Sequence, residues 1–166
     1  MGRGACPGRP PRPLNVRAVE PALVGSRVYD ASTMAAMRQR LPVKRGRRHL
    51  LATVDYSLAK RALINQVRTG LASWTDICDA HPELMRAAEH VGEQTRRECP
   101  VCHDARLKLV TYVYGDGLKH DNGRVWPLDV GLDMAADRPG SWCYVVEVCT
   151  ECHWNHLHEA FVARAG

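Results

Sequence analysis

No part of this 166-residue chain is long and apolar enough to span a membrane, which takes about 20 consecutive apolar residues. The N-terminus also lacks the continuous apolar stretch of a secretory signal, because Arg and Pro interrupt its small apolar residues. We therefore expect a cytoplasmic protein with no membrane contact. In the cytoplasm thiols stay reduced, so cysteines there bind metal more often than they form disulfides.

Catalytic motifs are missing as well. Gly115-Asp116-Gly117 lacks the further glycine and the lysine of a phosphate-binding loop. His156 could act as a general base only beside a nucleophile, and the sequence offers none. We therefore expect no enzymatic activity and no small-molecule substrate. Two acidic pairs are better explained as helix caps and solvent-facing residues than as acid–base pairs: Asp76 with Asp79, and Glu147 with Glu151.

The net charge of +5 is distributed very unevenly. Residues 1–50 contain eleven Lys and Arg but only two acids, whereas residues 51–166 contain 12 Lys and Arg and 16 Asp and Glu. The first 52 residues are also rich in Pro and nearly free of aromatics, a composition typical of disorder. We predict a disordered basic tail over residues 1–52, with a short helix over 32–41. Translation could also start at Met34 or Met37, which would remove the first residues.

A dense cationic run lies near the end of this tail, at Lys44, Arg45, Arg47 and Arg48. Such a run gains affinity for nucleic-acid phosphates by releasing counterions. It is therefore our candidate nucleic-acid contact, with RNA as the expected ligand. The alternative is a solvated extension without a partner.

Residues 53–95 are predicted to form a small unit of three helices. The first starts near Asp55 and ends at Gly70, the second opens at a capping box over 73–76, and the third covers 82–91. A helix-turn-helix is disfavoured because the third helix has a single Arg, and two Glu, where a recognition helix would present donors to bases. Packing against the rest of the chain or another protein explains it better.

Two Cys-x-x-Cys pairs are the strongest signal in the sequence. Four thiolates arriving as two pairs are the ligand set of a closed tetrahedral zinc site. A redox dithiol and an iron–sulfur centre remain alternatives, as does a histidine in place of one sulfur. Cys78 and Cys143 are expected to be small buried residues. The predicted zinc ligands are Cys99, Cys102, Cys149 and Cys152.

The segments beside the two pairs alternate like strands, over residues 107–114 and 142–148, with a third strand or a closing helix over 154–162. This order predicts an antiparallel zinc-ribbon-like domain over 96–162. The 46 residues between the pairs exceed the usual spacing of about 15–20. Turn residues over 115–140 predict a long hairpin loop that accounts for the excess. The expected fold class is therefore α+β.

Residues 52–163 resemble a family of small, uncharacterised, zinc-ribbon-like actinobacterial proteins. The motifs that carry the resemblance are Val54-Asp55-Tyr56, residues 78–84, Cys99-Pro100-Val101-Cys102, residues 145–149 and residues 152–157. The basic tail lies outside the resemblance. The family implies domain boundaries and a metal, and no activity.

Two functions fit these features. In the first, the protein is a non-catalytic zinc-binding accessory of RNA polymerase or the ribosome, and the tail contacts phosphates. In the second, it is a zinc-stabilised adaptor that binds another protein without touching nucleic acid. The cluster Trp154-Asn155-His156 is read either as a recognition surface or, preferably, as packing over the metal with His156 hydrogen-bonded.

Overall fold

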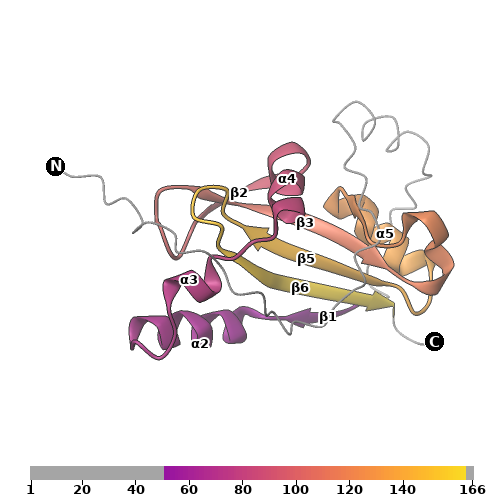
Figure 1. Cartoon of the computed structure of the whole chain (residues 1–166). Helices are drawn as coiled ribbons and strands as arrows, with labels where there is room; N and C mark the ends of the chain where they lie inside the picture. Colours follow the sequence, from indigo (N-terminus) through magenta and orange to yellow (C-terminus); the bar gives the residue numbers. More distant parts are fainter. Residues whose placement is uncertain (1–50, 164–166) are drawn as a thin grey trace.

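The computed structural model describes residues 51–163, which form an antiparallel sheet with helices on both faces (Figure 1). The strand order is β1-β6-β5-β3-β2, and β4 pairs with β3 outside this path. The expected α+β class is confirmed, and so is the third strand, β6. The strands are β1 (Leu51–Asp55), β2 (Glu93–Glu98), β3 (Arg106–Tyr114), β4 (Arg124–Trp126), β5 (Trp142–Val148) and β6 (Asn155–Ala163).

Two of the described helices, α3 and α4, begin where the sequence supplies side-chain caps. Ser73 and Asp76 form the predicted capping box at α3, and Pro82 occupies the first turn of α4 behind the N-cap His81. Gly70 follows α2 with a φ of 75°, a left-handed conformation that suits glycine. The helices are α2 (Ser57–Arg68), α3 (Trp74–Ile77), α4 (Pro82–His90), the 3-10 helix η2 (Asp116–Asp121) and α5 (Leu128–Asp137).

The two faces of the sheet carry different helices. Alternation along β3 turns Val113 toward α5 and Val110 toward α4. We call these the α5 face and the α4 face. At the other end of the α5 face, α2 and α3 pack on Leu107 and the cysteine pairs. Three apolar clusters thereby hold the helices to one sheet.

Two boundaries differ from the sequence predictions. Residues 115–140 connect two antiparallel strands as expected, but they contain η2, β4 and α5 instead of a long loop. The helix forms because its apolar residues cover Val113 and Cys143 on the sheet. The proposed boundary at residues 52 and 53 falls inside β1, which pairs with β6 along its whole length.

The predictions for residues 1–50, including the disordered tail, the helix over 32–41 and the start sites at Met34 and Met37, lie outside the described residues. Within residues 51–163, no helix has the length and apolar character needed to cross a membrane.

Candidate metal centre

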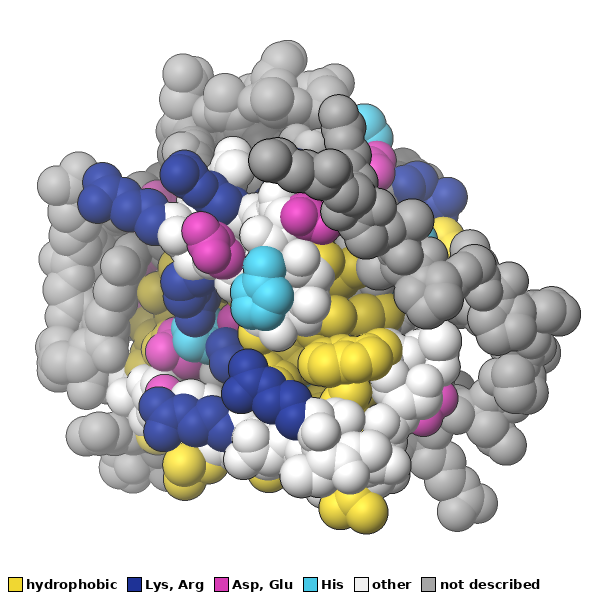
Figure 2. Space-filling model, turned by 90° about the vertical axis from the view of Figure 1, so that its left-hand side faces the viewer, with side chains coloured by type: hydrophobic (Ala, Val, Ile, Leu, Met, Phe, Trp, Pro, Cys, Tyr) yellow, Lys and Arg dark blue, Asp and Glu magenta, His cyan; other side chains and the backbone are white. Residues whose placement is uncertain are grey.

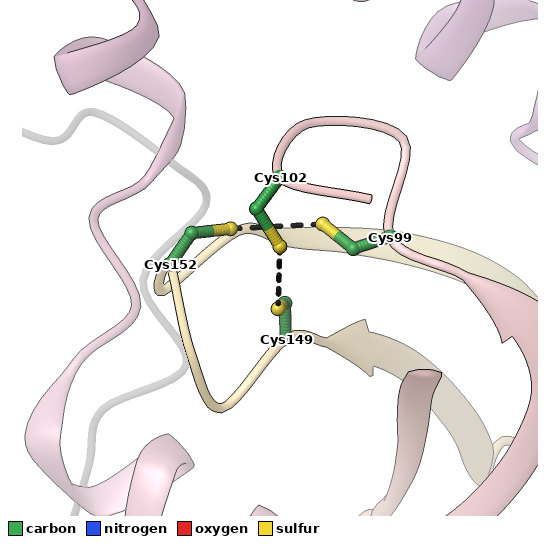
Figure 3. A group of neighbouring side chains, drawn as sticks. All are labelled: Cys99, Cys102, Cys149 and Cys152. Carbon is green, nitrogen blue, oxygen red and sulfur yellow. Dashed lines mark hydrogen bonds between the residues drawn. The ribbon is translucent and has the colours of Figure 1, made fainter. Parts of the chain in front are cut away.

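The topology of the sheet brings the two cysteine pairs to the same end. Cys99 and Cys102 lie in the turn between β2 and β3, and Cys149 and Cys152 lie in the turn between β5 and β6. β3 and β5 are antiparallel neighbours, with Lys108 opposite Val148, so both turns project from the same end of the sheet. Figure 3 shows the four side chains pointing toward one another.

The distances between the sulfurs suit a tetrahedral ion. The Sγ atoms of Cys99 and Cys152 are 3.6 Å apart, as are those of Cys102 and Cys149. All four Sγ atoms lie within 4.8 Å of one another. A tetrahedron with Zn–S bonds of about 2.3 Å separates its sulfurs by about 3.8 Å. The described structure therefore unites the four predicted ligands in a group that could hold a metal ion.

The two turns have the same local geometry. His103 donates its backbone N–H to the Cys99 carbonyl at 3.2 Å, and His153 does the same to Cys149 at 3.1 Å. Both histidines have positive φ, 58° and 65°, which a residue with a side chain adopts only at some cost. In the first turn, the Val101 N–H also donates to the Cys99 Sγ at 3.4 Å. The backbone thus aims both sulfurs of each pair inward.

The thiols are close enough to share protons: Cys99 lies within hydrogen-bond distance of Cys152, and Cys102 within that of Cys149, and either sulfur of each pair can donate. The neighbouring thiols lower the pKa of Cys149. They raise the pKa values of Cys99 and Cys152. Without a cation, four negative thiolates at these distances would repel one another. A divalent ion would remove that repulsion and favour four thiolates.

Apolar side chains enclose the site. Trp154 is fully buried in one cluster with Cys99 and Cys149, so it packs against the cysteine group as expected. Its ring stacks on His156 with centroids 5.8 Å apart. The expected hydrogen bond of His156 is absent at Nδ1, which is buried without a partner among the described residues. Burial accordingly lowers the pKa of His156.

The two remaining described cysteines lie in different surroundings. Cys143 is buried under α5, as expected, and burial raises its pKa to about 12. Cys78 is only half-buried and packs beside the four clustered cysteines, where a hydrogen bond with Cys152 lowers its pKa. Cys78 directly follows α3, and the turn there brings it next to Cys152. The sequence did not predict that these two residues lie close together.

Glu147 corrects an expectation from the sequence. It is fully buried, not solvent-facing, and its carboxylate accepts hydrogen bonds from the Lys60 ammonium at 2.9 and 3.0 Å. Arg97 lies 3.6 Å from the same carboxylate. The companion acids fit the prediction better, since Asp76 caps α3 and Glu151 is exposed. A buried acid with two basic neighbours is explained as a structural ion pair.

Charged side chains of both signs surround the end of the molecule that carries the cysteine turns. Figure 2 shows Lys and Arg side chains gathered on one side of this end, next to hydrophobic surface and interspersed with Asp and Glu. The predicted nucleic-acid contacts Lys44, Arg45, Arg47 and Arg48 lie outside the described residues.

Fold and site together define a small α+β protein with a group of four cysteines that could hold a metal ion. Comparison with known proteins places the chain more closely. Residues 45–166 match a family of unknown function, DUF5318, and the chain belongs to this family. Uncharacterized protein Rv0049 of Mycobacterium tuberculosis (strain ATCC 25618 / H37Rv) is 36% identical over 112 residues, which cover 68% of this chain and 82% of that protein. Uncharacterized protein Mb0050 of Mycobacterium bovis gives the same values.

The family match extends further toward the N-terminus than the resemblance predicted from the motifs. It begins at residue 45 and so includes Arg45, Arg47 and Arg48, whereas Lys44 stays outside. The basic run is therefore largely part of the family region. No solved structure matches this chain significantly.

Proposed function

We propose that this protein is a non-catalytic accessory protein stabilised by a structural Zn²⁺ at Cys99, Cys102, Cys149 and Cys152. The observation that carries the proposal is the convergence of four sulfurs, all within 4.8 Å of one another, from two hairpin turns. Four thiolates favour zinc over hard cations such as Mg²⁺. They also fill a tetrahedral shell, which leaves no open position for a substrate. Two cysteine turns on neighbouring antiparallel strands are the arrangement of a zinc ribbon.

Elemental analysis of the purified protein, combined with counting of reactive thiols, tests the zinc site. We expect one zinc per chain and four additional reactive thiols after chelation. Iron with visible charge-transfer absorption would favour an iron–sulfur centre instead. Absence of any metal, with reactive or disulfide-linked pairs, would overturn the site and favour a redox dithiol.

We further propose that the protein associates with a nucleic-acid machine of transcription or translation through its basic run. Support comes from the density of Lys and Arg at residues 44–48 and from the inclusion of three of them in the family match. Phosphate contacts of this kind weaken steeply as salt rises. Replacing Lys44, Arg45, Arg47 and Arg48 by Ala should therefore weaken RNA binding and flatten its salt dependence. Binding that is unchanged in this variant would refute the role of the run.

The alternative is an adaptor that binds another protein. It is favoured by three exposed apolar side chains on and beside α2 and α3: Leu58, Leu71 and Trp74, which are 74%, 81% and 41% exposed. Residues 51–166 also contain more Asp and Glu than Lys and Arg, and this excess of negative charge disfavours binding of a nucleic acid to much of their surface. If the zinc-loaded protein binds no RNA or DNA at low salt, this alternative becomes the leading function.

A further inference from the structure

A fifth thiol lies directly beside the four clustered cysteines. Cys78 packs against the same apolar cluster as Cys102 and Cys152, and its thiol makes a hydrogen bond with that of Cys152. It is not a member of the group of four sulfurs that could hold an ion. Four thiolates already fill a tetrahedral shell, so a bound zinc would leave Cys78 as a free thiol in contact with one of its ligands.

The chain segment that carries this fifth thiol is fixed against the turn between β5 and β6. The Ala80 N–H donates to the His153 carbonyl at 3.0 Å. The side-chain amide of Asn155 donates to the Asp79 carboxylate, also at 3.0 Å. These two hydrogen bonds join the residues that follow Cys78 to the residues that follow the last ligand. The backbone therefore holds the two thiols together independently of their own hydrogen bond.

Cys78 also differs from the other described cysteines in its access to solvent. It is half-buried, whereas Cys143, the other described cysteine outside the group of four, is fully buried under α5. Within the group, the sulfurs would be occupied by the metal. A small oxidant dissolved in water can therefore reach the sulfur of Cys78 more readily than the other free thiol of residues 51–163.

We propose that Cys78 is an oxidation site through which hydrogen peroxide releases the metal from the cysteine group. In the first step, the Cys78 sulfur attacks one peroxide oxygen and the O–O bond breaks. Cys78 becomes a sulfenic acid, and the second oxygen leaves as water. In the second step, the Cys152 thiolate attacks the Cys78 sulfur, the S–O bond breaks, and the departing hydroxide takes up a proton to form water. The two sulfurs together lose two electrons, and the peroxide gains them.

The disulfide removes one of the four metal ligands. Only Cys99, Cys102 and Cys149 remain, so the ion is bound more weakly and is released. Because metal-binding free energy contributes to folding, its release destabilises the two cysteine turns and the helices packed on them. The cysteine group thereby converts oxidation into a loss of structure at one end of the sheet. This inference rests on the proposed zinc site and adds a mode of regulation to it.

Disulfide mapping of the full-length, zinc-loaded protein tests the inference. The protein is treated with hydrogen peroxide, its remaining thiols are alkylated, and it is digested with trypsin and a glutamate-specific protease. Cleavage after Glu151 separates Cys149 from Cys152, and tryptic cleavage leaves Cys78 as the only cysteine of its peptide. We expect a cross-linked peptide pair that joins Cys78 to Cys152. A chromogenic chelator should detect release of the zinc over the same time course.

Substitution of the fifth thiol separates this route from direct oxidation of the ligands. Cys78→Ser keeps all four ligands, so it should bind zinc like the wild type but release it at least several-fold more slowly in peroxide. Cys143→Ala is the matched control, because it also removes a cysteine outside the group of four. It should release zinc at the wild-type rate. Cys6→Ala provides the same control for a cysteine outside the described residues.

Three results would overturn the proposal. The first is equal rates of zinc release from Cys78→Ser and the wild type. The second is a disulfide within one of the pairs, Cys99–Cys102 or Cys149–Cys152, while Cys78 stays reduced. This result is read from the wild type and so decides the question even if Cys78→Ser does not fold. The third is absence of zinc before peroxide is added, which would also overturn the metal site and is thereby distinguished from failure of the oxidation step alone.

Discussion

At the scale of single residues, Glu147 shows how the fold holds a charge in its interior. Its carboxylate is fully buried, and the Lys60 ammonium that it meets is mostly shielded, with 19% of its side chain exposed. A buried ion pair stabilises the folded state little more than apolar residues of the same shape would, because the cost of desolvating the charges offsets their attraction. Loss of one partner is costly, however, since the other charge then remains buried without full compensation. Arg97 compensates only in part at 3.6 Å.

We predict that Lys60→Met lowers the free energy of unfolding by about 3 kcal/mol, the low end for removing one partner of a buried pair. Adding Glu147→Leu to Lys60→Met should restore most of this loss, because no buried charge remains. Urea unfolding of the zinc-loaded protein measures both effects. The neighbouring Arg61→Met is the control, since Arg61 is exposed on the same helix and should cost little. Equal stability of Lys60→Met and Arg61→Met would contradict this account.

The cysteine ligands could be predicted from sequence because the Cys-x-x-Cys spacing is local and chemically specific. The environment of Glu147 could not, because its partner Lys60 is 87 positions away in the sequence. Alternation along β5 indicates that Glu147 shares a face with buried Val145, but it does not say which helix covers that face. For the same reason, the sequence does not predict that Cys78 lies close to Cys152.

At the scale of elements, α5 depends on a close approach to the sheet. A Cβ at Gly131 would lie 2.8 Å from the Thr111 Cγ2, 3.2 Å from the Cys143 Sγ and 3.3 Å from the Val113 Cγ2. A side chain at this position would therefore force α5 or the contacted side chains of β3 and β5 to shift. The turn residues around it led us to predict a loop. The apolar spacing of Val130 and Met134, one helical turn apart, was the signal for a helix.

Gly131→Ala should lower the free energy of unfolding although alanine favours helices. The clash with the sheet costs about 1–3 kcal/mol for overpacking, against a gain of about 1 kcal/mol in helix propensity. We expect a net loss of up to about 2 kcal/mol from these two terms. Gly117→Ala is the matched control, because its Cβ would come no closer than 4.0 Å to Arg138. A stabilised Gly131→Ala protein would show that α5 can move away from the sheet at little cost.

At the scale of the whole molecule, the cysteine centre connects parts of the chain that are distant in sequence. One apolar cluster contains Cys99 and Cys149 from the two turns, Ile64 from α2 and Ile77 from α3. The α5 cluster at the other end of the sheet shares no residue with it. A metal ion would therefore stabilise both hairpin turns and the two helices packed on them, and would act on α5 only through the sheet.

Removal of the metal should accordingly destabilise one end of the protein before the other. In Cys99→Ser or Cys152→Ser, or after chelation, we expect loss of zinc, a lower Tm and a weaker near-UV signal from Trp154, because metal-binding free energy contributes directly to folding. Hydrogen exchange should increase first in α2, α3 and the cysteine turns, and later in α5.

Cys78→Ser is the matched control, since Cys78 adjoins Cys152 but lies outside the group of four. It should keep its zinc and its Tm. Unchanged melting of Cys99→Ser would show that the four thiols do not hold a structural ion, whereas loss of zinc in Cys78→Ser would make the fifth thiol part of the site.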